Sequence, residues 1–408
     1  MNPQHTVSAD DSDTSRRYVA DGYGRDRQVL VVGEGLVAVS TAGFLAQAGL
    51  DPVIASPPDG GPSTEGAICW HSGLVLLERL GLRRPIERLG TRLDRLVPLA
   101  DDRSSSADTR APTSNADGTA PGSNPNGTAP ASLVAVDRDR LAPLLTDYVA
   151  DRIRVADRPI AAVEPTATGV RATFDGGPAE PFDAIVTTRR SLLSDREPTP
   201  PTGGLHCWEF AWPPSHTQPR APADAWGPHR AALVVPIGEG FRVRLVAAPD
   251  SAPADPLSVG DLAADFGHLF GRHDPFDAVD HGRLAYSRTP RTVPTTLVED
   301  RIARVGPASR AAIPGGCLDL ALGIEDGWVL ADALAYGPPS VDAALAAYER
   351  RRRERSRELT AWLAAAADRE ESTARSPWLR ELYARRRLAF SHVHGGLPAV
   401  AEAVPNRL

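Results

Sequence analysis

Three small residues at fixed spacing, Gly33, Gly35 and Ala38, have the clearest chemical meaning in this sequence. They form a Gly-x-Gly-x-x-Ala pattern between an apolar, β-branched run ending at Val32 and a stretch whose apolar residues recur at helical spacing. There, the first glycine permits a tight turn and the second lets backbone approach a diphosphate, which the free N–H groups of the helix N-terminus bind. The pattern predicts a dinucleotide site, and the alternative is a glycine-rich turn that binds nothing.

The residue expected to bind the ribose differs from the usual acid. Sites of this kind carry an acidic residue about 20 residues further on, at the end of the second strand. Ser56 occupies that place here. Its hydroxyl can hydrogen-bond to a ribose but carries no charge, so the sequence predicts weaker cofactor binding than a carboxylate would give.

The elements that must position this site follow the order strand, helix, strand. Residues 28–32 form a nearly continuous apolar run, typical of a parallel strand buried on both faces. A helix is expected over 36–49 and a second strand over 52–55. Further along we expect a hairpin around 238–240, a strand at 301–306, and two helices at 318–336 and 341–366.

Composition limits the class of protein. At 408 residues the chain can form two domains, because single cores stop growing at roughly 250 to 300 residues. All 45 basic residues are arginine and the formal net charge is -7, which does not favour a nucleic-acid partner. The three cysteines are widely spaced and no segment has the ~20 apolar residues of a transmembrane helix, so a cytoplasmic location is expected.

Other clusters of polar residues carry weaker signals. His268, His273 and His281 are not spaced as a pair on one helix face, so no metal site is predicted. The arginines over 350–357 alternate with glutamates within helical reach, which favours a self-paired solvated face over a surface for an anionic partner. No residue is identified as a catalytic acid, base or nucleophile.

Several segments resemble the flavin-dependent monooxygenases of the para-hydroxybenzoate hydroxylase family, and the resemblance extends over about 28–366. Residues 76–82 look like the helix that follows the glycine pattern in that family. Residues 136–141 are similar to its Val-x-Arg-x-x-Leu segment, whose arginine, Arg138 here, lies near the flavin. Ile324-Glu325-Asp326 matches a motif in the family's late helix.

The resemblance implies an α/β fold: a Rossmann-like FAD-binding domain with a smaller β-sheet substrate domain. The expected division is a disordered leader at 1–27, the first part of the FAD-binding domain at 28–204 with a low-complexity insertion at 101–132, a β-rich substrate domain at 205–296, the second part of the FAD-binding domain at 297–366, and a C-terminal helical tail at 367–408.

It also implies FAD as cofactor, NAD(P)H as reductant, and hydroxylation or epoxidation of a small organic molecule, aromatic or lipid-like. The protein would position the reactants while the flavin supplies the chemistry. Neither the exact substrate nor the oligomeric state follows from the residues. The cofactor-binding residues implied by the glycine pattern and by the resemblance together are Gly33, Gly35, Ala38, Ser56, Arg138, Gly306 and Pro314.

The chain departs from the family at two places near the expected cofactor. Where the family reads Gly-Ala-Asp-Gly after a strand, residues 187–190 read Thr-Thr-Arg-Arg, which removes an acid and brings in arginines able to pair with phosphates. Where the family reads Gly-Asp-Ala-Ala-His, residues 306–310 read Gly-Pro-Ala-Ser-Arg. Pro307 has neither a side-chain acceptor for a ribityl hydroxyl nor a backbone N–H. Pro314 is retained, but the Gly-Gln-Gly that follows in the family is Cys-Leu-Asp at 317–319.

These departures leave three readings open. FAD still binds through the intact glycine pattern, and the chain is an FAD-dependent oxidoreductase of the monooxygenase kind. Alternatively, the chain keeps the fold without the cofactor and serves as a non-catalytic binding module. A third reading is a different flavin reaction, such as dehydrogenation or reduction of a polyprenyl-type lipid.

Overall fold

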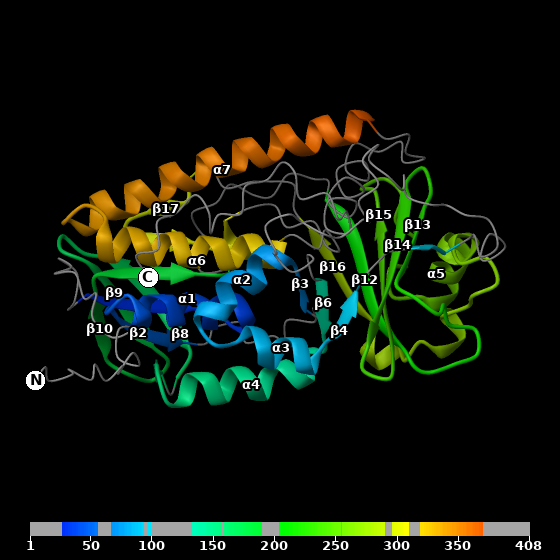
Figure 1. The fold of residues 1–408 in the computed structure, drawn as a ribbon, viewed down its shortest axis with the longest axis horizontal. Coiled ribbons are helices and arrows are strands. Elements are labelled where there is room, and N and C mark those ends of the chain that lie inside the picture. The colour runs from blue at the N-terminus through cyan, green and yellow to red at the C-terminus, as the bar shows by residue number, and fades with distance from the viewer. Residues whose placement is uncertain are drawn as a thin grey trace, which may run out of the picture.

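The computed structural model describes residues 27–55, 67–93, 97–99, 133–156, 158–189, 204–253, 255–289, 296–309 and 319–369. A mostly parallel sheet with its covering helices lies at one end of the molecule, and a second, mostly antiparallel sheet with one helix lies at the other (Figure 1). Three short strands lie between them, β3 (Ala67–Cys69), β6 (Leu133–Val136) and β4 (Thr91–Leu93).

The first six-stranded sheet has β1 near its centre. Its order is β17-β18-β11-β1-β2-β7, and all neighbours are parallel except β17 and β18. The strands are β1 (Gln28–Val32), β2 (Asp51–Ala55), β7 (Arg154–Val155), β11 (Ala184–Thr187), β17 (Val298–Glu299) and β18 (Ile302–Arg304). The chain leaves β1 toward β2 on one side, and β11 joins β1 on the other. The carboxyl ends of β1 and β11 therefore flank the topological switch point, where open α/β sheets bind ligands.

Alternating side chains of β1 give this sheet two buried faces. Val29 and Val31 enter a core with the helices, whereas Leu30 and Val32 enter a core with a three-stranded antiparallel sheet on the other face. That small sheet consists of β8 (Ile160–Pro165), β9 (Val170–Phe174) and β10 (Ala179–Phe182). The helices are α1 (Gly35–Gln47), α2 (His71–Arg79), α3 (Arg83–Leu89), α4 (Arg138–Ala150), α6 (Asp319–Tyr336) and α7 (Val341–Arg369).

The second six-stranded sheet has the order β16-β12-β15-β14-β13-β5. Its strands are β5 (Val97–Pro98), β12 (Leu205–Trp212), β13 (Ala223–Trp226), β14 (Arg230–Ile237), β15 (Gly240–Ala247) and β16 (Ala285–Thr289). One face carries an aromatic core in which Trp208, Phe210 and Trp212 pack with residues of α5 (Val259–Phe266) and the turns after it. This core shares no residue with the two cores of the parallel sheet.

The structure confirms the predicted α/β fold class with its parallel sheet. The predicted strand at 28–32 is β1, the helix expected at 36–49 is α1, and the hairpin around 238–240 joins β14 to β15 with Gly238 at a φ of 63°. Gly238 sits in the left-handed region that such tight turns require.

Three boundaries differ from the sequence expectation. The leader was expected to reach residue 27, but the Arg27 guanidinium donates hydrogen bonds to the carbonyls of Leu334 and Pro339. β5, from the expected first part of the FAD-binding domain, pairs with β13 of the second sheet. The last helix, α7, continues to Arg369, beyond the expected 366. The rest of the leader, the insertion at 101–132 and the tail from 370 onward lie outside the described residues.

Within the described part of the chain, no helix combines the length and the apolar character that a bilayer crossing needs. The same residues contain no group of three or more His, Cys, Asp or Glu side chains that could hold a metal ion.

Candidate dinucleotide-binding site

The turn between β1 and α1 has the geometry that a diphosphate requires. Gly35 has a left-handed φ of 71°, and a Cβ added to it would meet no atom of the described residues within 4 Å. The N-cap residue of α1, Glu34, is extended, and its side chain does not cap the helix. The first-turn N–H groups and the positive end of the helix dipole therefore face an open approach beside Gly35.

Gly33 is required for packing rather than for a left-handed turn. Its φ of 159° is essentially extended. A Cβ at this position would lie 2.0 Å from Oγ1 of Thr188, whose side chain covers Gly33. Two hydrogen bonds fix this contact, because the Gly33 N–H donates to the Ala55 carbonyl and the Thr188 N–H donates to the Val32 carbonyl, each at 3.1 Å. Ala38, the last residue of the pattern, is fully buried in α1.

An ion pair spans the switch point in front of this turn. Arg189, which follows β11, places Nη2 3.3 Å from Oε1 of Glu34, and both side chains are a little over one quarter exposed. Thr187 holds the backbone of Arg189, since its Oγ1 accepts from the Arg189 N–H at 3.0 Å. The sequence predicted arginines able to meet phosphates here but missed Glu34 as a partner. The missing signal was the adjacency of β1 and β11, which only the sheet order reveals.

Gly306, at the end of β18, lies against α1 and α6. Its φ is 57°, and a Cβ would come within 3.0 Å of Cγ1 of Val37. Its N–H donates to Oδ2 of Asp326 at 2.8 Å, and the Ser309 hydroxyl lies 2.9 Å from the same oxygen. Glycine is needed here for close packing and for the left-handed backbone. Its N–H is bound within the protein.

The carboxylate that holds this loop belongs to a buried cluster of charges. Oδ1 of Asp326 accepts from Nε of Arg352 at 2.6 Å, and Glu325 lies 3.4 Å from the same guanidinium. Burial alone would lower the pKa of Arg352, but the two carboxylates raise it above its usual range, so the guanidinium stays charged. The sequence match at Ile324-Glu325-Asp326 marked this position without indicating what it binds.

The structure brings Gly33, Gly35, Ala38 and Gly306 together around the start of α1. Arg138 is the first residue of α4, and its side chain lies outside the description. Ser56 and Pro314 also lie outside the described residues. Their implied roles therefore stay predictions.

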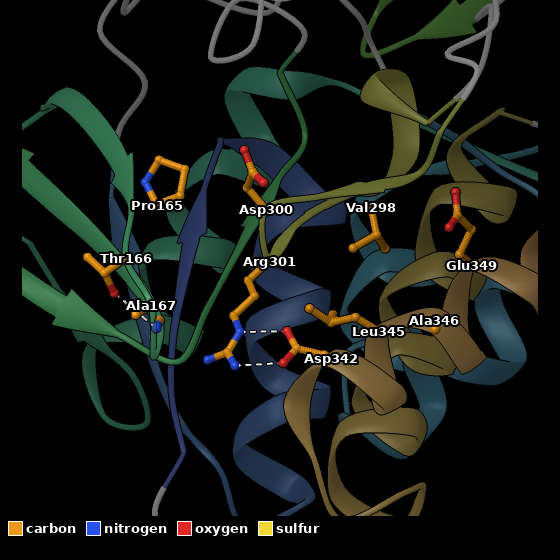
Figure 2. A pocket seen from close by; sticks show the side chains of 11 residues that line it. Pro165, Thr166, Ala167, Val298, Asp300, Arg301, Asp342, Leu345, Ala346 and Glu349 are labelled. Atoms are coloured by element: carbon orange, nitrogen blue, oxygen red, sulfur yellow. Dashed lines mark hydrogen bonds and ion pairs between the residues drawn. The ribbon is translucent and has the colours of Figure 1, made fainter.

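A cavity of about 350 Å³ lies beside the turn between β17 and β18, at the amino end of β18 (Figure 2). Asp300 and Arg301 form the turn between β17 and β18 with φ values of 48° and 62°. The Arg301 guanidinium binds both oxygens of Asp342, at 2.6 and 2.7 Å (Figure 2). It also donates to the carbonyl of Thr168. These contacts fasten the hairpin to α7 and to the turn between β8 and β9. The cavity therefore lies where the β17–β18 hairpin is attached to α7, at the amino end of β18, whereas Gly35 follows the carboxyl end of the parallel strand β1.

Comparison with protein-family models and with curated proteins finds no match to this sequence. Solved structures do match. HpxO of Klebsiella pneumoniae complexed with FAD and uric acid has a TM-score of 0.62 and 18% identity, covering 92% of this chain and 91% of that one. PqsL of Pseudomonas aeruginosa, a probable FAD-dependent monooxygenase, has a TM-score of 0.60 and 15% identity over 88% and 99% of the two chains.

The tetrameric form of 2-methyl-3-hydroxypyridine-5-carboxylic acid oxygenase has a TM-score of 0.61 and 19% identity, over 93% of this chain and 96% of that one. At such identities the likeness bears on architecture, which is shared over nearly the full length of each chain. This chain has the fold of the FAD-dependent monooxygenases related to para-hydroxybenzoate hydroxylase, as the sequence resemblance predicts.

Proposed function

We propose that this chain is an FAD-dependent oxidoreductase of the monooxygenase kind that acts on a small organic substrate, aromatic or lipid-like. The observation that carries the proposal is the start of α1 beside left-handed Gly35, at the switch point between β1 and β11, where no described residue stands within 4 Å of an added Cβ. A helix N-terminus without a side-chain cap binds diphosphate through its N–H groups. The likeness to HpxO, which was crystallised with FAD and uric acid, supports the same reading.

The residues at this turn fit the diphosphate of FAD. The backbone at Gly35 and the first turn of α1 would bind its oxygens, and Arg189 would add a positive charge from the other side of the switch point. Bound flavin would supply electron transfer from NAD(P)H and reaction with oxygen, which no side chain of the protein can perform. The chain's own task is to bind, orient and exclude water. A cytoplasmic location, expected from the cysteines, is part of the same proposal.

We place the organic substrate beside the face of the second sheet that points away from α5. Trp208 and Phe210 of β12 enter the aromatic core, so Glu209 between them points to the opposite face. Oε2 of Glu209 accepts from Nε and Nη2 of Arg244 at 3.0 and 2.6 Å, and Oε1 lies 3.6 Å from Nε of Arg242. A few polar groups on a largely apolar surface are what a small-molecule site needs for orientation.

The proposal is tested with protein reconstituted with FAD and freed of excess cofactor. NAD(P)H consumption is followed at its absorbance maximum while a panel of hydroxylated aromatics and polyprenyl lipids is added. We expect at least one class to accelerate NAD(P)H consumption and to yield an oxygenated product by mass spectrometry. Consumption that no added compound changes, in protein that holds FAD, would instead support a different flavin reaction. A protein that cannot be loaded with FAD would support the non-catalytic binding module.

A further inference from the structure

The ion pair between Glu34 and Arg189 joins two segments that are 155 residues apart in the chain. Glu34 comes from the turn after β1 and Arg189 from the end of β11, so the pair spans the switch point of the parallel sheet. Neither side chain is part of a buried core, because Glu34 is 27% exposed and Arg189 is 28% exposed. Their charges therefore stay accessible to a ligand that enters beside Gly35.

An anionic ligand would find opposite conditions at the two side chains. Arg189 can form paired hydrogen bonds with phosphate oxygens, since its planar guanidinium matches their geometry. The Glu34 carboxylate has the same sign as a phosphate and lies at the positive end of α1, where a diphosphate would also be attracted. Partly exposed ion pairs contribute little stability, so separating the two side chains costs little.

We propose that Glu34 is an internal counter-ion of Arg189 that the diphosphate of the cofactor displaces. In the free protein Glu34 neutralises Arg189. In the complex the diphosphate lies between Arg189 and the first turn of α1, and Glu34 turns toward solvent. Arg189 then strengthens binding, and Glu34 weakens it by competing for the same cation. This inference rests on the proposed function, because it assumes that a dinucleotide enters at Gly35.

The test is a calorimetric titration of flavin-free protein with FAD, ADP and riboflavin, at low and at high sodium chloride. ADP carries the diphosphate without the flavin, and riboflavin carries the flavin without phosphate. Arg189→Met should weaken the binding of FAD and of ADP by about tenfold or more. Glu34→Gln should tighten both by a few-fold and should leave riboflavin unchanged. Salt should weaken FAD binding in the wild type more than in Arg189→Met.

Two controls separate charge from folding. Arg189→Lys keeps the charge without the planar fork and should give an intermediate affinity for ADP. Arg83→Met removes an arginine of α3 that pairs with Glu78 and Glu87, and it should leave ADP binding unchanged. Wild-type affinity for FAD and ADP in both Arg189→Met and Glu34→Gln overturns this proposal alone. Wild-type protein that binds neither FAD nor ADP overturns the proposed function as well.

Discussion

Arg352 acts on the loop at Gly306 through Asp326. It is 3% exposed and Asp326 is 1% exposed, and the same carboxylate that receives Nε of Arg352 also receives the Gly306 N–H. A buried charge that loses its partner keeps its desolvation cost without compensation. The geometry of the late loop therefore depends on a residue of α7 that acts through this carboxylate.

At this scale we predict that Arg352→Met lowers the free energy of unfolding by about 3 to 5 kcal/mol, because buried Asp326 loses the guanidinium that compensates its charge, whereas Glu325 keeps Arg355 at 3.6 Å. Arg353→Met is the matched control, since Arg353 pairs with Glu349 one turn away and its side chain is 44% exposed. The control should cost less than about 1 kcal/mol. Urea unfolding followed by circular dichroism measures both. Equal losses in the two variants would contradict the prediction.

Residue types alone identified the glycine pattern, because Gly35 must be left-handed wherever this turn forms. They did not identify the contacts of Gly33 with Thr188 or of Glu34 with Arg189. Both contacts join segments more than 150 residues apart, and they exist only because β11 lies beside β1. Local residue preferences do not indicate that β11 lies beside β1.

At the scale of elements, α1 and α6 pack closely through glycines of α6. A Cβ at Gly327 would lie 2.2 Å from Oγ1 and 3.0 Å from Cα of Thr41 in α1. The helices would have to separate to admit it. The strands and long helices themselves were predictable from periodicity, since they bury continuous or regularly spaced apolar residues. β5 consists of two residues paired to β13, which are too few to show the sequence pattern of a strand.

We therefore predict that Gly327→Ala destabilises the protein by about 1 to 3 kcal/mol, despite the better helix propensity of alanine. Gly260→Ala in α5 is the matched control, because a Cβ there would have no neighbour closer than 3.8 Å. That substitution should be neutral or stabilising by up to about 1 kcal/mol. Thermal unfolding midpoints compare the two, and a Gly327→Ala protein as stable as the wild type would disprove the tight contact.

The edge of the second sheet contains a titratable contact between β12 and β16. Nε2 of His206 lies 3.2 Å from the Pro249 carbonyl, which can only accept, so Nδ1 of the neutral ring accepts from the Tyr286 hydroxyl at 2.8 Å. Burial lowers the pKa of His206 below its ordinary 6.5, and Arg288 lowers it further, although the Pro249 carbonyl opposes this. The neutral ring is therefore the form that the fold favours.

The sign of the pH effect follows from that direction. Below about pH 6.5 the unfolded chain binds a proton at this position more readily than the folded one, so the stability contributed by neutral His206 is complete above that pH and is lost as the pH falls toward the folded pKa. We predict that the difference in urea midpoint between wild type and His206→Gln shrinks from about pH 7.5 to about pH 5.5. A difference that stays constant over this range would contradict the lowered pKa.

At the scale of the whole molecule, the two six-stranded sheets occupy opposite ends, and the start of α1 lies at the end of the parallel sheet's central strands (Figure 1). The substrate side and the cofactor side of the proposed enzyme thus come from separate cores. Their separation fits an enzyme in which the parallel sheet binds the cofactor and the second sheet orients the organic substrate. This assignment of cofactor and substrate to the two sheets depends on a diphosphate binding at the β1–α1 turn.

The most direct test of this claim is a titration of the flavin-free protein with FAD, followed by flavin fluorescence, for wild type, Gly35→Ala and Gly81→Ala. Gly35 and Gly81 have φ values of 71° and 73°, and in the described part of the chain a Cβ at either would meet nothing within 4 Å, so the two substitutions strain the backbone alike. Only the Cβ at residue 35 would stand where the diphosphate must approach. The account predicts about one FAD per chain in wild type and in Gly81→Ala, with binding strongly weakened in Gly35→Ala. Wild-type affinity in Gly35→Ala, or no FAD binding by the wild type, would contradict it.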